Sequence, residues 1–235
     1  MKPKDLKPPF SWESRYVLLE DKVFYIPERY DYAHFTFPGW EAIFGNNNPV
    51  YIEYCSGNGD WIIDQALASP QVNWVAVEKR FDRVRKIWSK RENLGIKNLL
   101  VTCSMAQTVT NEFIPKGSIS KIFVNFPDPW PKDRHAKHRL FQPPFMKMVY
   151  GALKEGGELI GVTDDPDYIQ QILEVVTGHG GLHSQFEAPY TKEAWPEEGE
   201  DKGYGKTSYF QALWSRLGRR FYFYRFEKQK ELASK

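Results

Sequence analysis

The run from residue 121 to 132, Lys-Ile-Phe-Val-Asn-Phe-Pro-Asp-Pro-Trp-Pro-Lys, joins an apolar segment to a turn that carries a carboxylate and an aromatic ring. Its apolar half predicts a buried strand. Pro127 and Pro129 fix the backbone and remove two donors, so Asp128 is presented on a rigid turn. A ring such as Trp130 can stack on a nucleobase, and a carboxylate can accept hydrogen bonds from the base N–H groups. The turn therefore indicates a nucleobase site, with a stiff crossover loop as the simpler alternative.

A basic segment follows this turn directly, and its charges suit phosphates. The residues are Lys132, Arg134, His135, Lys137, His138 and Arg139. Contacts of this kind give affinity for nucleic acid that depends on salt and little on sequence. The two histidines have no neighbours of the metal-ligand type, so the segment predicts phosphate contact or solvation and no metal site.

A second cluster lies in Glu53-Tyr-Cys-Ser-Gly-Asn-Gly59-Asp60, between an expected strand and an expected helix. In doubly wound sheets the first strand–helix turn meets a nucleotide-like cofactor, and glycines allow the backbone to approach it. Glu78 ends the next expected strand, where a carboxylate can accept hydrogen bonds from two ribose hydroxyls. This pair of signals fits both NAD and S-adenosylmethionine.

Charge favours the second of these cofactors. A dinucleotide fold needs a third glycine to seat pyrophosphate on the helix N-terminus, and position 62 is Ile. Asp60 at the helix start would oppose pyrophosphate, whereas S-adenosylmethionine carries cations and no phosphate. Glu53 and Asp60 therefore favour the methyl donor, although Asp60 can equally be an ordinary N-cap residue.

Strands that alternate with helices predict βαβ units and a mostly parallel sheet. Strands are expected at 50–55, 73–78, 98–103, 121–126, 157–163, 182–187 and 221–227. Helices are expected at 60–68, 80–94, 139–153 and 166–176. Residues 1–48 are rich in aromatic residues and proline, and we expect an irregular extension packed on a domain of residues 49–235. The acidic segment 189–206 contains several glycines and is expected to form a mobile loop.

Composition is compatible with one large domain plus an extension, because 235 residues with 41% hydrophobic content can build a full core. No apolar run reaches the roughly 20 residues of a membrane span, and no signal-peptide region is evident, so a cytoplasmic protein without membrane contact is expected. Two cysteines predict neither a disulfide framework nor a metal site. The net charge of +2 is small, but basic residues cluster at 79–91, 132–139 and 216–230.

Three motifs occur in one order: Glu53-x-x-x-Gly57-x-Gly59, Glu78, and Phe126-Pro-Asp-Pro-Trp130-x-Lys132. With them the chain resembles the bacterial tRNA (guanine-N7-)-methyltransferase family, from about Tyr51 to the C-terminal strand. The resemblance implies an α/β fold of the Rossmann-like class I methyltransferase type, with a mostly parallel seven-stranded sheet and helices on both faces. It implies methyl transfer from S-adenosylmethionine to N7 of guanine 46 in the tRNA variable loop, by a monomer or homodimer and without a metal.

The resemblance also assigns roles to residues, with Asp128 as the catalytic aspartate. Positions expected to bind the cofactor are Glu53, Gly57, Gly59, Glu78, Met105 and Asp128. Positions expected to bind the substrate are Lys132, Asp164, Ser208, Tyr209, Phe210 and Gln211. Phosphate contacts are expected from Arg134, Lys137 and Arg139.

Three positions depart from the family pattern. Cys55 replaces a loop glycine, Met105 replaces an acidic or amide residue, and Gln211 replaces a glutamate. These changes bear on donor affinity more than on the reaction type. They leave open a catalytically weakened tRNA-binding protein of the same fold. A nucleic-acid amino-methyltransferase and an NAD-dependent oxidoreductase are further alternatives.

Overall fold

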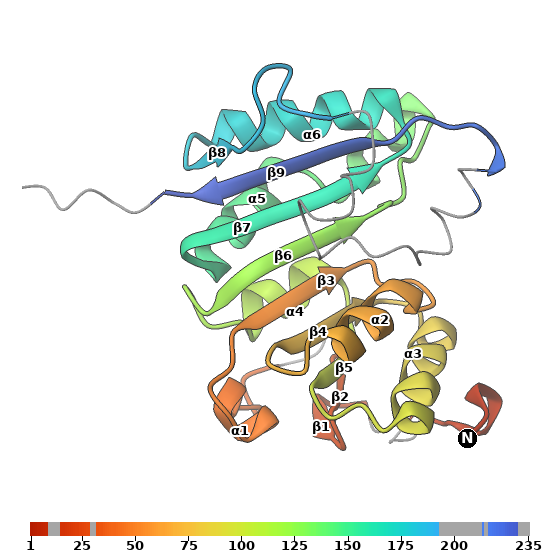
Figure 1. Ribbon diagram of the computed structural model, residues 1–235. Coiled ribbons are helices and arrows are strands. Elements are labelled where there is room, and N and C mark those ends of the chain that lie inside the picture. Colours follow the sequence, from red (N-terminus) through yellow and green to blue (C-terminus); the bar gives the residue numbers. More distant parts are fainter. Residues whose placement is uncertain (9–14, 29–31, 193–212, 214–215, 230–235) are drawn as a thin grey trace, which may run out of the picture. The chain divides into compact units, whose positions relative to one another are not determined.

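The computed structural model describes residues 1–8, 15–28, 32–192, 213 and 216–229. They fall into two compact units, the first up to Pro115 and the second from Lys116 onwards. The described residues contain nine strands, where seven were expected. The alternation of strands and helices predicted from residue 50 onwards is confirmed (Figure 1).

The first unit contains five strands in the order β1-β2-β5-β4-β3. Their bounds are β1 (Leu18–Glu20), β2 (Val23–Tyr25), β3 (Val50–Tyr54), β4 (Asn73–Glu78) and β5 (Leu99–Cys103). All neighbours pair in parallel except β1 and β2. Every residue of β4 and β5 is buried, which accords with their near-continuous apolar sequences, because parallel strands are usually covered on both faces.

Helices of the first unit are η1 (Pro3–Asp5), α1 (Trp40–Phe44), α2 (Asp60–Ala68), α3 (Phe81–Leu94) and α4 (Ala106–Glu112). Helices α2 and α3 lie against β4 and β5. Helix α3 ends at Leu94 and is capped by Gly95, whose φ of +65° suits a left-handed C-cap. The sequence did not predict α4, because its short run contains β-branched residues that disfavour helix.

Residues 1–48 are more regular than expected, because β1, β2 and α1 lie within them. The turn between β1 and β2 is held by Arg91 of α3. Its guanidinium donates to the carbonyl oxygens of Lys22 and Asp21 over 2.5 and 2.6 Å. Strand β2 pairs in parallel with β5 and so extends the sheet. The domain boundary at residue 48/49 stays a prediction.

The second unit contains four strands in the order β6-β7-β9-β8. Their bounds are β6 (Ile119–Asn125), β7 (Leu153–Thr163), β8 (Leu182–Ser184) and β9 (Tyr222–Lys228). Strands β6 and β7 are parallel, and β9 is antiparallel to both β7 and β8. The sheet is therefore mixed in this unit.

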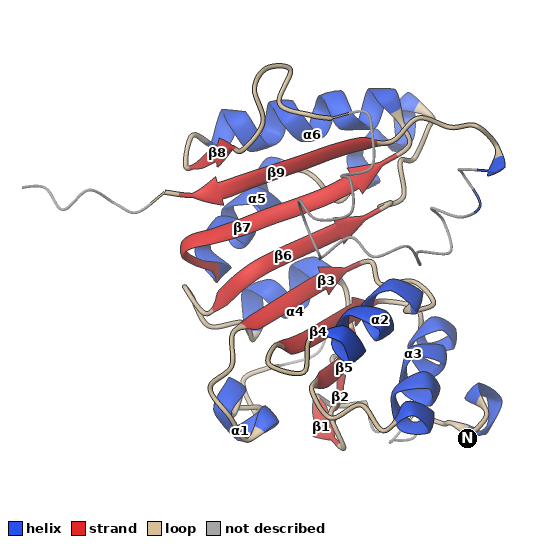
Figure 2. Ribbon diagram, in the orientation of Figure 1, coloured by secondary structure: helices blue, strands red, loops and turns tan. Residues whose placement is uncertain are grey.

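Helices of the second unit are η2 (Asp133–His138), α5 (Pro143–Ala152) and α6 (Pro166–His179). The helix expected from residue 139 begins later, at Pro143, because proline suits the first turn of a helix and Gln142 takes the N-cap position. Helices α5 and α6 lie side by side and contact β7 (Figure 2).

Each unit has a core rich in aromatic residues. Trp74, Tyr54 and Phe24 are almost fully buried in the first unit. Phe141, Phe145, Tyr168, Tyr224 and Phe226 are almost fully buried in the second. Much of the aromatic content of 16% therefore serves packing rather than stacking on a ligand.

Candidate functional site

The glycine loop, residues 55–59, turns the chain sharply between β3 and α2. Cys55, Gly57 and Gly59 all have positive φ values, of 61°, 56° and 78°. A Cβ on Gly59 would lie 2.6 Å from Cγ1 of Ile87, a residue of α3 with no exposed surface. Glycine is therefore required at position 59 by both backbone conformation and the close packing of the loop on α3.

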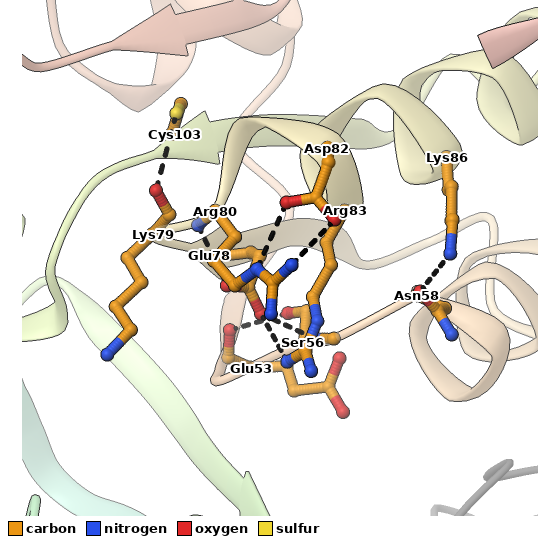
Figure 3. A network of polar contacts seen from close by, with 11 residues as sticks. Glu53, Ser56, Asn58, Glu78, Lys79, Arg80, Asp82, Arg83, Lys86 and Cys103 are labelled. Atoms are coloured by element: carbon orange, nitrogen blue, oxygen red, sulfur yellow. Dashed lines mark hydrogen bonds and ion pairs between the residues drawn. The ribbon is translucent and has the colours of Figure 1, made fainter. Parts of the chain in front are cut away.

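Glu78 holds this loop from the end of β4. One carboxylate oxygen accepts the N–H of Gly57 over 3.0 Å, and the other accepts the N–H of Arg80 over 2.9 Å (Figure 3). The Arg83 guanidinium lies 3.7 Å from the first oxygen. Glu78 is only 4% exposed, but a carboxylate offers about four lone pairs, so acceptor capacity remains.

Two lysines of α3 hold the outer side of the glycine loop. Lys86 donates to Oδ1 of Asn58 over 3.0 Å, and Lys90 donates to the Asn58 carbonyl oxygen over 2.9 Å (Figure 3 draws Lys86). Lys90 also pairs with the Asp60 carboxylate at 2.5 Å. The N-cap of α2 is Gly59, so the interpretation of Asp60 as an N-cap residue is wrong. Asp60 is instead neutralised by a lysine that sequence reasoning missed.

The other predicted cofactor residues of the first unit lie at the same ends of neighbouring strands. Glu53, in β3, is 3% exposed, and its carbonyl oxygen accepts the Ser56 hydroxyl over 2.9 Å. Met105 follows β5, is half-buried and takes the N-cap position of α4. Because β3, β4 and β5 are parallel, their carboxyl ends lie at one edge of the sheet. This edge of the first unit thus brings together the predicted residues Glu53, Gly57, Gly59, Glu78 and Met105.

The Pro-Asp-Pro-Trp turn follows β6 in the second unit. Phe126, just before the turn, and Trp130, at its end, have positive φ values of 48° and 44°, which are uncommon for bulky residues. The N–H of Phe126 donates to the Val162 carbonyl over 2.8 Å. Asp128 is exposed, and its Oδ1 accepts the N–H of Trp130 over 3.2 Å. As predicted, the turn is neither helix nor strand and presents the carboxylate at its tip.

Trp130 packs against the basic segment that follows. Its ring centroid lies 5.2 Å from that of His138 and 5.8 Å from that of His135. The Trp130 ring is half-buried, and in this structure it packs the turn against η2. Around this cluster the predicted phosphate-binding side chains of Lys132, Arg134 and Lys137 are exposed.

Arg139 is placed differently from the other predicted phosphate contacts. It is 8% exposed, and its guanidinium donates to the Pro129 carbonyl oxygen and to the Gln171 side chain, each over 2.7 Å. A buried guanidinium with two protein acceptors is not presented to an incoming phosphate. The prediction of a phosphate contact at Arg139 is therefore not supported by its position.

Asp164 follows β7 and forms an ion pair with Arg219, a partner that could not be predicted from the sequence. Its side chain is 8% exposed, whereas that of Arg219 is 47% exposed. Asp164 does not cap the next helix, because Asp165 is the N-cap of α6 and accepts the Tyr168 N–H over 2.8 Å. The carboxylate of Asp164 therefore lies at the end of β7, paired with Arg219.

Four predicted substrate-binding residues, Ser208, Tyr209, Phe210 and Gln211, lie outside the described residues, as does most of the loop expected at 189–206. Within the described part of the chain, no group of three or more His, Cys, Asp or Glu side chains is arranged to hold a metal ion. No helix among the described residues is long and apolar enough to cross a membrane.

A family model described as "Putative methyltransferase" matches residues 47–224. The tRNA (guanine-N(7)-)-methyltransferase of Chlamydia felis (strain Fe/C-56) is 47% identical over 230 residues, which cover 97% of this chain and 98% of that protein.

Two solved methyltransferases share the fold at low identity. The antibiotic-resistance methyltransferase Kmr is 19% identical with a TM-score of 0.57, covering 84% of this chain and 95% of its own. A mutant 16S rRNA (adenine(1408)-N(1))-methyltransferase with cosubstrate SAM, from Catenulisporales acidiphilia, is 13% identical with a TM-score of 0.53, covering 82% and 91%. These likenesses confirm the Rossmann-like α/β methyltransferase fold. The 47% identity over nearly the full length of both proteins, with the family model over residues 47–224, establishes that the chain belongs to the tRNA (guanine-N(7)-)-methyltransferase family.

Proposed function

We propose that this chain transfers a methyl group from S-adenosylmethionine to N7 of guanine 46 in the variable loop of tRNA. The observation that carries the proposal is the 47% identity, over 97% of the chain, to a protein named for this type of activity. The glycine loop held by Glu78 and the exposed Asp128 give it a structural basis. The monomer or homodimer expected from the sequence stays a prediction.

The glycine loop and its acids suit S-adenosylmethionine. A Cβ built on Gly57 would find its nearest heavy atom, the Cys55 carbonyl oxygen, 3.9 Å away, so a ligand can approach this backbone. Glu78 keeps acceptor capacity for ribose hydroxyls beyond the two backbone N–H groups that it already binds. Glu53 and Glu78 also supply negative charge toward a cationic ligand. Met105 would form a soft apolar wall beside the adenine.

The acceptor atom requires no general base. N7 of guanine carries an in-plane lone pair and no hydrogen, so the new N–C bond forms without removal of a proton. When bound, S-adenosylmethionine supplies the methyl group, and the electron pair of the broken S–C bond stays on sulfur. Positive charge therefore passes to the purine. The protein must hold N7 in line with the S–CH₃ bond and stabilise that charge.

Asp128 is assigned to the second task. Its carboxylate would accept hydrogen bonds from N1–H and N2–H of guanine, which makes N7 more electron-rich and stabilises the cationic product. The bond from the Trp130 N–H to Oδ1 sets the orientation of the carboxylate before substrate arrives. Asp128 then acts by electrostatics and not as a base.

Contacts with tRNA are assigned to the basic segment and to Asp164. The exposed Lys132, Arg134 and Lys137 would bind phosphates, and tRNA shape together with the base pocket would select one guanine. Asp164 would bind guanine or sugar hydroxyls. The substrate contacts of the segment Ser208, Tyr209, Phe210 and Gln211 rest on the resemblance alone.

The test uses labelled S-adenosylmethionine and two unmodified tRNA transcripts, one with guanine 46 and one with adenine there. We expect label in the first only, and we expect Asp128→Asn, which keeps the size and removes the charge, to abolish most of it. Absence of label from both, with tRNA still retained on a filter, would replace the proposal by the tRNA-binding alternative.

A further inference from the structure

We propose that Arg139 is a positioning residue that holds the turn carrying Asp128, rather than a ligand of tRNA phosphate. The inference rests on the proposed function for its kinetic consequence, but its structural part can be tested without catalysis. Its basis is a chain of contacts that runs from the Pro-Asp-Pro-Trp turn through Arg139 to α6.

The first contact fixes the centre of the turn. Nε of Arg139 donates to the carbonyl oxygen of Pro129 over 2.7 Å, between Asp128 and Trp130. Proline has no N–H, so the carbonyl is the only polar backbone group through which Pro129 can be held. The tip of the turn is thus held by two hydrogen bonds in the described structure, this one and the bond from the Trp130 N–H to Asp128.

The second set of contacts anchors Arg139 itself. Nη1 donates to Oε1 of Gln171 over 2.7 Å, and the guanidinium carbon lies 5.2 Å from the centre of the buried Tyr168 ring. Gln171 in turn donates to the Phe141 carbonyl oxygen over 2.9 Å. The Phe141 N–H donates to the Tyr168 hydroxyl over 3.2 Å. Arg139 is therefore fixed at both ends of its guanidinium.

The turn needs such a restraint because it is strained. Phe126 and Trp130 both adopt positive φ, and bulky side chains persist there only where the surroundings over-determine the backbone. The prolines contribute stiffness but no donors. Arg139 supplies a donor to the turn and is itself held by α6. Helix α6 also contains Tyr168, whose N–H donates to the side chain of Asp165, the residue next to Asp164. Arg139 thus connects the turn after β6 with α6, the helix that follows β7.

Arg139→Lys separates the two roles, because lysine keeps the charge but loses the fork that reaches both Pro129 and Gln171. A phosphate ligand would tolerate this change, since lysine binds phosphate as a point charge. A positioning residue would not, and we expect kcat for tRNA methylation to fall roughly 10- to 100-fold, as misplacement of a reacting group does. The tRNA Kd and its salt dependence should stay close to those of the wild type.

Lys137→Ala is the matched comparison, because Lys137 is exposed and lies in the same segment. Loss of a true phosphate contact should weaken tRNA binding and reduce the slope of log K against log salt by about 1. Arg139→Lys and Arg139→Ala should lack this signature. If Arg139→Ala shows the reduced slope with kcat unchanged at saturating tRNA, Arg139 is a phosphate ligand and the proposal is overturned.

A second variant and a non-catalytic measurement keep the test decisive. Gln171→Leu removes the anchor without removing any charge, so it should lower kcat in the same direction and be non-additive with Arg139→Lys. Amide hydrogen exchange should accelerate in peptides covering residues 126–132 in both variants, and not in those covering the glycine loop. Unchanged exchange at 126–132 would refute the positioning role even if the wild type proved inactive on tRNA. An inactive wild type with accelerated exchange in the variants would refute only the proposed function.

Discussion

Gly59 is the position in the glycine loop at which an added methyl group should be most disruptive. Its φ of +78° lies in the left-handed region, where a residue with a Cβ costs about 1–2 kcal/mol. A Cβ there would also lie 2.6 Å from Cγ1 of Ile87 and 3.2 Å from its Cβ and Cγ2. Ile87 is fully buried, and overpacking against such a side chain adds about 1–3 kcal/mol. Gly59→Ala should therefore lower the free energy of unfolding by about 2–5 kcal/mol.

Gly95→Ala provides the control for backbone strain. Gly95 has a similar φ of +65°, but a Cβ there would find no heavy atom within 4 Å. The clash should therefore appear as the difference between the two variants, about 1–3 kcal/mol, or about 2–12 °C in Tm for a chain of this size. Thermal unfolding followed by circular dichroism measures that difference, and calorimetric titration with S-adenosylmethionine should show weaker binding for Gly59→Ala only. Equal losses of Tm in the two variants would refute the packing of the loop on Ile87.

Three further predictions concern the two thiols and the carboxylate of Glu158, which pairs with both Lys121 and Arg225. Cys55→Gly should raise the free energy of unfolding by about 0.5 kcal/mol. The change removes the left-handed strain at φ +61°, and this gain exceeds the loss caused by the greater entropy of the unfolded chain. Urea unfolding measures the difference. Iodoacetamide should alkylate exposed Cys55 and spare Cys103, whose pKa is raised to about 12 by burial and then by the charge of Glu78. S-adenosylmethionine should slow that alkylation, and an unchanged rate by mass spectrometry would place the donor elsewhere. Burial alone would raise the pKa of Glu158, but the hydrogen bonds and charges of Arg225 and Lys121 outweigh it and lower the pKa. The contribution of Glu158 to stability is therefore fully present above its pKa in the unfolded chain, 4.5, and is lost as the pH falls through its lower pKa in the folded protein. Unfolding measured as a function of pH should show this loss in the wild type and not in Glu158→Gln.

The elements that position the site were largely predictable, because each has a strong local signal. Strands β3, β4 and β5 are mostly apolar runs, the glycines follow β3, and Glu78 ends β4. Strands β1 and β2 were missed because each has only three residues, and β2 is stabilised by pairing with β5 about 78 positions later in the chain (Val23 with Val101). Helix α4 was missed because its composition disfavours a helix.

The partners of the site residues were not predictable, because they come from distant parts of the chain. Lys90 neutralises Asp60 from 30 positions away, and Arg219 pairs with Asp164 from 55 positions away. The sequence shows clusters of basic residues at 79–91 and 216–230, but the local sequence does not indicate which of their side chains pairs with an acidic residue of the site. The same holds for Arg139, which belongs to a basic run by sequence and to the support of the turn by structure.

The accepting atom in the proposed reaction is N7 of one guanine in tRNA. The most direct measurement compares methyl transfer to two tRNA molecules that differ only in having guanine or 7-deazaguanine at position 46. The deaza base keeps the N1–H and N2–H edge proposed to bind Asp128, but has a C–H group in place of N7. We predict full labelling of the guanine tRNA and none of the deaza tRNA, which should still bind and compete. Equal labelling of both would contradict the proposed function.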